Sequence, residues 1–266
     1  MYLGCMKDEF RDGGVLYGLC STYPASGIIE GMCPGWDFVW IDGQHGEHTN
    51  ESIFHCAQAS RAAGVHCMIR VAGHETAMLS LCADMAPSAI MIPMVNSAQQ
   101  AESIVQALRF PPRGIRSYGG RAVIDLYGRD YHNKANPLIV AQIETEYALE
   151  HVQEIAAVEG IDVLFFSPDD MKLSKNINVN TRLLDDDALV KGIKTVSDAA
   201  RKNGKYCGIV APGAPERSFC VDMGYQLIVV GGDSGFIRTL SALKLSEIRD
   251  EKQHAGDAGG DAEQAK

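Results

Sequence analysis

The stretch LIVAQIETEYALEHVQEIAAVEGIDVLFFSPDDMKLS, residues 138–174, decides the fold of this chain. It opens with a short apolar run rich in branched side chains, which is typical of a strand buried on both faces. The next segment places four apolar side chains on one helical face: Leu149, Val152, Ile155 and Ala156. After Gly160, the run VLFFS predicts a second buried strand. A strand, a helix and a strand of this length indicate a right-handed crossover between two parallel strands.

Acidic residues follow both of these strands. Glu144 comes directly after the first strand, and Asp169 and Asp170 come after the second. The carboxyl ends of parallel strands lie at one edge of a sheet, so we expect these carboxylates to lie close together. Two carboxylates without neighbouring cysteine or histidine suit a hard divalent cation that keeps several waters. A single such acid would more simply cap a helix or meet a surface lysine, and that alternative stays open.

The rest of the chain repeats the alternation of strand and helix. Six more apolar runs predict strands at residues 15–22, 37–45, 66–71, 89–95, 206–211 and 226–233. Eight buried strands that alternate with helices predict a single-domain TIM (β/α)8 barrel over residues 1–249. A doubly wound open sheet is the alternative, but no G-x-G-x-x-G motif follows the first strand. Residues 250–266 are small, charged and poor in apolar side chains, so we expect a disordered tail.

Composition narrows the possible partners. The net charge of −10 and the lack of a Lys/Arg cluster argue against nucleic acid or an anionic membrane as a partner. The N-terminus lacks the apolar core of a signal peptide, and no run of about 18 apolar residues could span a bilayer. The eight cysteines are scattered without C-x-x-C pairs, which is typical of reduced core thiols. We expect a cytoplasmic, globular protein.

One long segment, Arg109–Pro137, is punctuated by glycine and proline and shows no clear periodicity. Compact domains rarely carry such a segment unless it serves as a lid or a binding loop. We expect it to close over a bound substrate, with Arg121 among the donors for a substrate carboxylate. A structural crossover between the two halves of the barrel is the alternative.

Polar residues gather at the strand ends, where a TIM barrel has its active site. The candidates in chain order are Asp42, His45, Arg70, Glu144 and Asp170, with Asp84 on the helix before the fourth strand. A cation on the two acids would polarise a 2-oxo acid, while Arg70 would stabilise the negative charge of an enolate oxygen. His45, oriented by an acid, would move a proton. The alternatives are a structural His45 and a core ion pair for Arg70. The spacing of His45 and His48 is only a weak zinc signal.

Six segments, taken in order, resemble one family. WDFVWIDGQHG, MIRVAGHE, IMIPMVNSAQQAE, RFPPRGIRSYGGRA, QIETEYALEHVQEIAAVEGID and SPDDMKLS are similar to metal-dependent 2-oxo-acid aldolases of the HpcH/HpaI type. The resemblance runs from about Gly13 to Leu240. It implies a TIM barrel whose final helix is commonly exchanged between protomers of a homo-oligomer, a trimer of dimers. It also implies reversible aldol cleavage of 4-hydroxy-2-oxo acids to pyruvate and an aldehyde through a metal-bound enolate.

The resemblance also implies roles for single residues. Glu144 and Asp170 match the ligands of a divalent metal, with Mg²⁺ or Mn²⁺ expected and Co²⁺ also accepted by such a site. Arg70 matches the catalytic arginine, His45 and Asp42 match the residues after the second strand, and Asp84 matches an aspartate that pairs with the histidine. The neighbouring positions expected to contact substrate are Gln44, Ser167, Pro168, Asp169 and Arg121.

Two of these positions depart from the pattern of the family. Gln44 stands where a glutamate is usual, and Ser167 stands where a glycine is usual. The first change removes a charge beside His45, and the second adds a side chain close to the metal. These changes leave two rivals open. One is a decarboxylase of oxaloacetate, or a synthase, that uses the same enolate. The other is a barrel that binds metal and small acids without turnover.

Overall fold

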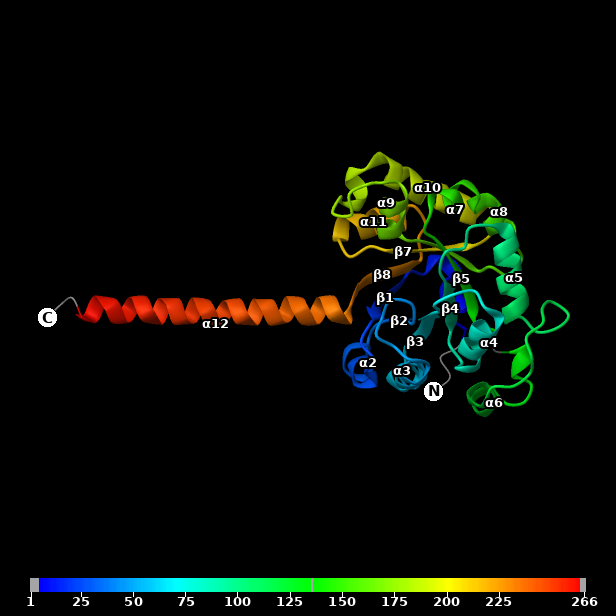
Figure 1. Cartoon of the computed structure of the whole chain (residues 1–266), viewed down its shortest axis with the longest axis horizontal. Coiled ribbons are helices and arrows are strands. Elements are labelled where there is room, and N and C mark those ends of the chain that lie inside the picture. The colour runs from blue at the N-terminus through cyan, green and yellow to red at the C-terminus, as the bar shows by residue number, and fades with distance from the viewer. Residues whose placement is uncertain (1–4, 135, 264–266) are drawn as a thin grey trace.

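Eight parallel strands close into a barrel in chain order, and the last strand pairs with the first (Figure 1). The computed structural model describes residues 5–134 and 136–263, with side chains given for these residues except Asp12 and those beyond Asp250. The strands are β1 (Leu16–Ser21), β2 (Phe38–Asp42), β3 (His66–Arg70), β4 (Ala89–Ile92), β5 (Leu138–Ile143), β6 (Val163–Phe166), β7 (Tyr206–Val210) and β8 (Leu227–Gly232). The predicted TIM barrel is confirmed.

Helices follow the strands and surround the barrel. They are α1 (Met6–Glu9), α2 (Ser26–Met32), α3 (Asn50–Ala63), α4 (Thr76–Asp84), α5 (Ala98–Leu108), α6 (Arg121–Tyr127), α7 (Glu146–Glu150), α8 (Val152–Ala157), α9 (Pro168–Ser174), α10 (Asp187–Lys202), α11 (Ala214–Asp222) and α12 (Asp233–Glu263). Short 3-10 turns are η1 (Arg11–Gly13), η2 (Tyr131–Asn133) and η3 (Leu183–Asp185).

Alternation along the strands separates two apolar layers. Phe38, Met68 and Phe165 belong to the cluster that fills the interior of the barrel, together with Met6 and Phe10 from the N-terminal segment. The residues between them along the strands pack instead against the surrounding helices, in a second and larger cluster. Because successive side chains point to opposite faces of a strand, every second residue of a strand faces the interior.

The helix boundaries follow recognisable local signals. Ser97 accepts a hydrogen bond from the Gln100 N–H at 3.2 Å, so it caps the N-terminus of α5, a position where serine is strongly preferred. The helix predicted after β5 is divided into α7 and α8 at His151. There the backbone leaves the helical conformation, and the His151 ring contacts the Tyr147 carbonyl at 2.9 Å.

The last helix, α12, is long and projects away from the barrel (Figure 1). Its helical backbone continues to Glu263, beyond residue 249, where the barrel domain was expected to end. The disorder predicted for residues 250–266 and the division of the chain at that point stay predictions. At the start of the helix, the fully buried Asp233 accepts hydrogen bonds from the Thr22 and Tyr23 N–H groups at 2.9 and 3.0 Å.

The long segment Arg109–Pro137 lies at the amino end of the barrel. It connects the end of α5 to the start of β5, and it contains α6 and η2. Helices of a barrel run from the carboxyl edge of the strands back to their amino edge, so this connection is remote from the strand ends that carry Glu144 and Asp170. Within one chain it is a structural crossover rather than a lid. In the part of the chain that the structure describes, no helix has the length and apolarity needed to cross a membrane.

The cysteines provide a test of the packing. Cys5 is exposed, while burial raises the pKa of the Cys33 and Cys56 thiols to about 11 and that of Cys67 to about 12. Thiolate is the reactive form, so these buried thiols are protonated at pH 8 as well as shielded. We predict that iodoacetamide modifies Cys5 rapidly at pH 8 and the buried cysteines only after unfolding, as peptide mass spectrometry would show. Rapid native labelling of Cys67 would contradict this packing.

Candidate active site

A cavity of about 390 Å³ opens at the carboxyl edge of the barrel. Its lining combines predicted site residues with others: Trp40, His45, Arg70, Gln142, Ser167, Pro168, Asp169, Asp170, Lys172, Thr181, Arg182, Leu183, Val210, Pro212, Gly213 and Glu216. The strand ends therefore bring together residues that are more than one hundred positions apart in the sequence.

Arg70 and Asp42 form a buried ion pair at the ends of β3 and β2. The Arg70 Nε donates to Asp42 Oδ1 at 2.9 Å, and its Nη2 donates to Oδ2 at 2.7 Å. The guanidinium carbon also lies 4.5 Å from the centre of the Trp40 ring. Burial by itself would raise the pKa of Asp42, but the hydrogen bonds and charge of Arg70 outweigh it and hold that pKa below its usual value. The ion pair therefore holds the positively charged Arg70 guanidinium in a fixed position beside the cavity.

The same carboxylate also shapes the loop after β2. Asp42 Oδ1 accepts the backbone N–H groups of Gln44 and His45 at 3.0 and 3.1 Å. An acid, Asp42 or Asp84, was expected to orient the His45 imidazole, but the Asp42 carboxylate holds the His45 backbone instead. The imidazole is exposed at the cavity and forms no hydrogen bond with the residues that the structure describes.

Glu144 and Asp170 approach each other at the ends of β5 and β6. Burial raises the pKa of Glu144, and the negative charge of Asp170 raises it further. The Met94 N–H donates to Glu144 Oε2, and Arg70 and Ser167 partly offset the rise. Two carboxylates so close that one disfavours ionisation of the other are an arrangement that a divalent cation would relieve.

Ser167 and Gln142 extend this acidic site. The Gln142 Nε2 donates to the Ser167 hydroxyl at 2.8 Å, while Gln142 Oε1 is buried without a partner among the described residues. Ser167, which was predicted to add a side chain close to the metal, also links Gln142 to Glu144 through its hydroxyl group. In the same part of the chain no cluster of three or more His, Cys, Asp or Glu side chains is arranged to hold a metal. A hard cation here would have two protein carboxylates and take water or substrate oxygens as further ligands, as Mg²⁺ commonly does.

Two predicted site residues lie elsewhere in this chain. Asp84 ends α4 at the amino side of the barrel, where the buried Arg116 donates to Asp84 Oδ1 at 2.7 Å. Arg121 is exposed on α6 and pairs with Asp125. Neither residue lines the cavity, because both belong to elements that return to the amino edge. No contact between Asp84 and His45 is possible inside one barrel of this topology.

Sequence reasoning missed several residues of the cavity. Trp40 and Gln142 stand two positions before Asp42 and Glu144, so they share the inward face of the same strands. A polar glutamine inside an otherwise apolar strand was the available signal. No comparable sequence signal marks the other lining residues Lys172, Arg182 and Glu216, which lie on α9, in the loop before η3 and on α11.

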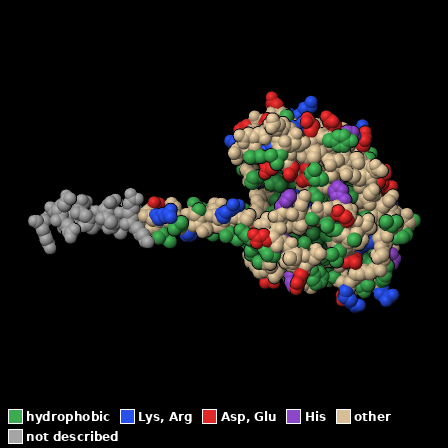
Figure 2. All heavy atoms as spheres, in the orientation of Figure 1, with side chains coloured by type: hydrophobic (Ala, Val, Ile, Leu, Met, Phe, Trp, Pro, Cys, Tyr) green, Lys and Arg blue, Asp and Glu red, His purple; other side chains and the backbone are tan. Residues whose placement is uncertain are grey.

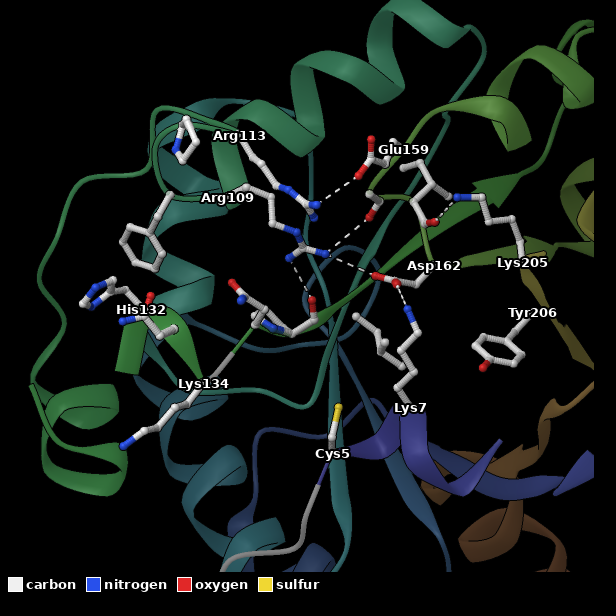
Figure 3. Close-up of a pocket in the computed structure, with 18 of the residues that line it drawn as sticks. Cys5, Lys7, Arg109, Arg113, His132, Lys134, Glu159, Asp162, Lys205 and Tyr206 are labelled. Carbon is white, nitrogen blue, oxygen red and sulfur yellow. Dashed lines mark hydrogen bonds and ion pairs between the residues drawn. The ribbon is translucent and has the colours of Figure 1, made fainter. Parts of the chain in front are cut away.

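A larger cavity, of about 770 Å³, lies at the amino end of the barrel (Figure 3). Asp162 is at its centre, 3.0 Å from Lys7 Nζ and 3.2 Å from Arg109 Nη2. Arg113 pairs with Glu159, and Lys205 donates to two backbone carbonyls. These contacts join α1, the segment after α5 and the segment before β6, so they hold the amino end of the barrel together. Size alone is therefore a poor guide to the active site here.

Comparisons with known proteins agree with this geometry. A family model described as HpcH/HpaI aldolase/citrate lyase matches residues 27–239. The hydroxypyruvate/pyruvate aldolase of Delftia acidovorans is 30% identical over 252 residues, 91% of each chain. The 4-hydroxy-2-oxovalerate aldolase of Novosphingobium aromaticivorans is 33% identical over 234 residues, 86% of this chain and 88% of the other. A crystal structure of an HpcH/HpaI aldolase/citrate lyase family protein from Burkholderia cenocepacia J2315 superposes with a TM-score of 0.83 at 26% identity, covering 92% of this chain and 98% of that one.

The ion pair beneath the cavity gives a prediction for stability. Asp42→Asn leaves the buried Arg70 without a counter-charge, so the free energy of unfolding at pH 7 should fall by about 3–5 kcal/mol. The folded-state pKa of Asp42 is lowered. Its contribution is therefore complete above its unfolded pKa of about 3.9 and is lost as the pH falls through the lower folded value. Denaturant unfolding of both proteins between pH 7 and pH 2 should show the difference shrink in acid. A constant difference would contradict the pair.

Proposed function

Because this chain belongs to the HpcH/HpaI aldolase/citrate lyase family, we propose that it is a metal-dependent carbon–carbon lyase. Its reaction is the reversible aldol cleavage of a 4-hydroxy-2-oxo acid to pyruvate, or a related 2-oxo acid, and an aldehyde. The observation that carries the proposal is that Arg70 and Asp170 line one cavity, while the buried Glu144 interacts electrostatically with both of them. The two relatives that are 30% and 33% identical are named as aldolases of this kind.

Glu144 and Asp170 would hold the divalent cation. Their mutual repulsion and the unpartnered Gln142 carbonyl make the site suited to a hard ion such as Mg²⁺ or Mn²⁺. When bound, such an ion polarises the carbonyl group of a 2-oxo acid and orients its carboxylate. Ser167, Pro168 and Asp169 border this position at the start of α9 and would contact the substrate there, while the Gln44 backbone is held by Asp42.

Arg70 would stabilise the charge that develops on the substrate oxygen. In aldol cleavage the 4-hydroxyl group loses its proton, the bond between C3 and C4 breaks, and the electron pair passes into the oxo acid as an enolate. A guanidinium already held in place by Asp42 and Trp40 needs no reorganisation as this charge appears.

His45 would move the protons. Its imidazole faces the cavity and makes no other hydrogen bond among the described residues, so it is available to accept the 4-hydroxyl proton. The enolate then takes a proton at C3 to give pyruvate, and the aldehyde leaves. In one chain Asp84 is remote from His45, so any contact between them requires a second copy of the protein.

Removal of the metal ligands is the direct test of this function. We predict that Glu144→Gln and Asp170→Asn each lower metal-dependent pyruvate release at least a hundredfold, because a neutral amide binds a hard cation much more weakly than a carboxylate does. The measurement is pyruvate release from a panel of 4-hydroxy-2-oxo acids and oxaloacetate, using chelator-treated protein with and without added Mg²⁺ or Mn²⁺. Glu146→Gln, an exposed surface variant, is the matched control.

The same panel separates the rivals. Release from oxaloacetate alone would favour a decarboxylase or a synthase that uses the enolate. Unchanged release from Arg70→Ala would reject the role proposed for this residue. Metal binding by calorimetry without release from any substrate would favour a barrel that binds small acids without turnover.

We also propose that the protein is a cytoplasmic homo-oligomer, a trimer of dimers, held together partly by α12. Phe236, Leu240 and Leu243 lie one turn apart on α12 and are exposed, and apolar side chains follow the projecting helix in Figure 2. A solitary helix in water is marginally stable, and exposed apolar patches of this kind commonly mark an interface. Packing of this stripe against a second barrel would bury it. In this proposal the barrel domain comprises residues 1–249, and residues 250–266 form a separate C-terminal tail.

Charge placed in the apolar stripe should weaken this assembly. We predict that the double variant Leu240→Glu, Leu243→Glu dissociates at concentrations where the unchanged protein stays oligomeric, because two carboxylates cannot be buried without partners. Light scattering after size-exclusion chromatography measures the mass. Ser241→Glu, which introduces the same charge on the opposite, exposed side of α12, is the control. Equal masses for all three proteins would contradict the proposal.

A further inference from the structure

The cavity at the carboxyl edge is larger than the oxo acid requires. A water molecule occupies about 30 Å³ in the liquid, so about 390 Å³ accommodates roughly a dozen groups of that size. A three-carbon oxo acid bound at Glu144, Asp170 and Arg70 fills only part of this space. The rest lies against a second wall, and in an aldol cleavage that space belongs to the aldehyde half of the substrate.

Three separate segments form this second wall. They are the start of α9, with Asp169 and Lys172, the loop before η3, with Arg182, and the start of α11, with Glu216. Lys172 is buried, and its Nζ donates to Asp169 at 2.9 Å and to the Val179 carbonyl at 3.1 Å. The second of these bonds fixes the loop that carries Arg182 over the cavity.

The wall carries as many cations as carboxylates. Lys172 pairs with Asp169, and Arg182 approaches Glu216 at 3.4 Å. An aldehyde with a carboxylate of its own would face two carboxylates as well as the two cations, with no net attraction. An apolar aldehyde would displace water from both ion pairs without forming a hydrogen bond in its place, which is unfavourable.

The hydrogen-bonding capacity of this wall is incomplete. Arg182 has five N–H donors, its side chain is 66% exposed, and among the described residues its guanidinium makes a single long contact, to Glu216 at 3.4 Å. Glu216 Oε2 is buried and has no partner among the described residues. Gly213 makes room for this carboxylate, since a Cβ there would lie 1.9 Å from the same oxygen. Donors and an acceptor therefore lie close together without a full set of partners.

We propose that Arg182 and Glu216 form a subsite for a hydroxylated, uncharged aldehyde. A hydroxyl group both donates and accepts, so it can bind the Arg182 guanidinium and the Glu216 carboxylate together. Such a site favours substrates with a hydroxyl group on the carbon next to the bond that breaks. This inference rests on the proposed aldol cleavage, because it assigns the aldehyde half of the same substrate.

Two substrates that differ by one hydroxyl group test the subsite. One is 4-hydroxy-2-oxopentanoate, which yields acetaldehyde, and the other is 4,5-dihydroxy-2-oxopentanoate, which yields glycolaldehyde. We expect Arg182→Ala to lower kcat/KM for the dihydroxy acid about tenfold and to change that for the monohydroxy acid less than twofold. Glu216→Gln should shift the ratio in the same direction, and Arg182→Lys should restore part of it. Arg201→Ala, which removes an exposed arginine of α10 paired with Asp198, should change neither value.

A third measurement separates this inference from the proposed function. Exchange of the pyruvate methyl protons in D₂O, followed by NMR with metal added, reports enolate formation without any aldehyde. If the unchanged protein shows no exchange, the proposed function itself fails. If exchange is normal in Arg182→Ala while both substrates lose kcat/KM equally, or neither does, the subsite is refuted. Normal exchange with selective loss of the dihydroxy acid supports it.

Discussion

Arg70 and Asp42 stand directly opposite each other on β3 and β2, and their bidentate ion pair is almost completely removed from water. Neither charge could occupy that position alone, because a buried charge without a partner is strongly unfavourable. The pair does more than cancel charge. The same aspartate binds two backbone N–H groups of the following loop, so the position of His45 depends on it. The cation, the loop and the histidine are therefore one unit, and the acidic site on β5 and β6 is built beside it.

The barrel could be predicted because its signal is distributed along the chain. Eight apolar runs separated by helical segments leave few other topologies. In a barrel the strand ends share one edge, and in the structure this edge places His45, Arg70 and Asp170 at one cavity, with Asp42 paired to Arg70. The ion pair itself could not be predicted, since it depends on the register between β2 and β3. A single sequence carries no direct record of which residues stand opposite each other.

The residues that a single barrel does not bring to the site lie outside the strands. Asp84 and Arg121 were expected near the site, and within one chain they lie on α4 and α6 at the other end. Position along a helix decides at which end of a barrel a side chain lies, and Asp84 ends its helix. The second wall of the cavity contains a residue, Lys172, that sequence reasoning did not place there. Lysine is seldom buried, so its sequence context gave no reason to expect Lys172 inside the cavity rather than in solvent.

The buried Asp233 has a consequence for the synthesis of the protein. It binds the Thr22 backbone across 211 positions of sequence and so joins the last strand to the first. A ribosome releases β1 long before β8 exists, and the nascent sheet then has an open edge along β1 that only the final part of the chain can cover. The contact that closes the ring is thus among the last that can form. Translation that stops before residue 227 would release a curved sheet with an exposed edge rather than a smaller version of the same protein.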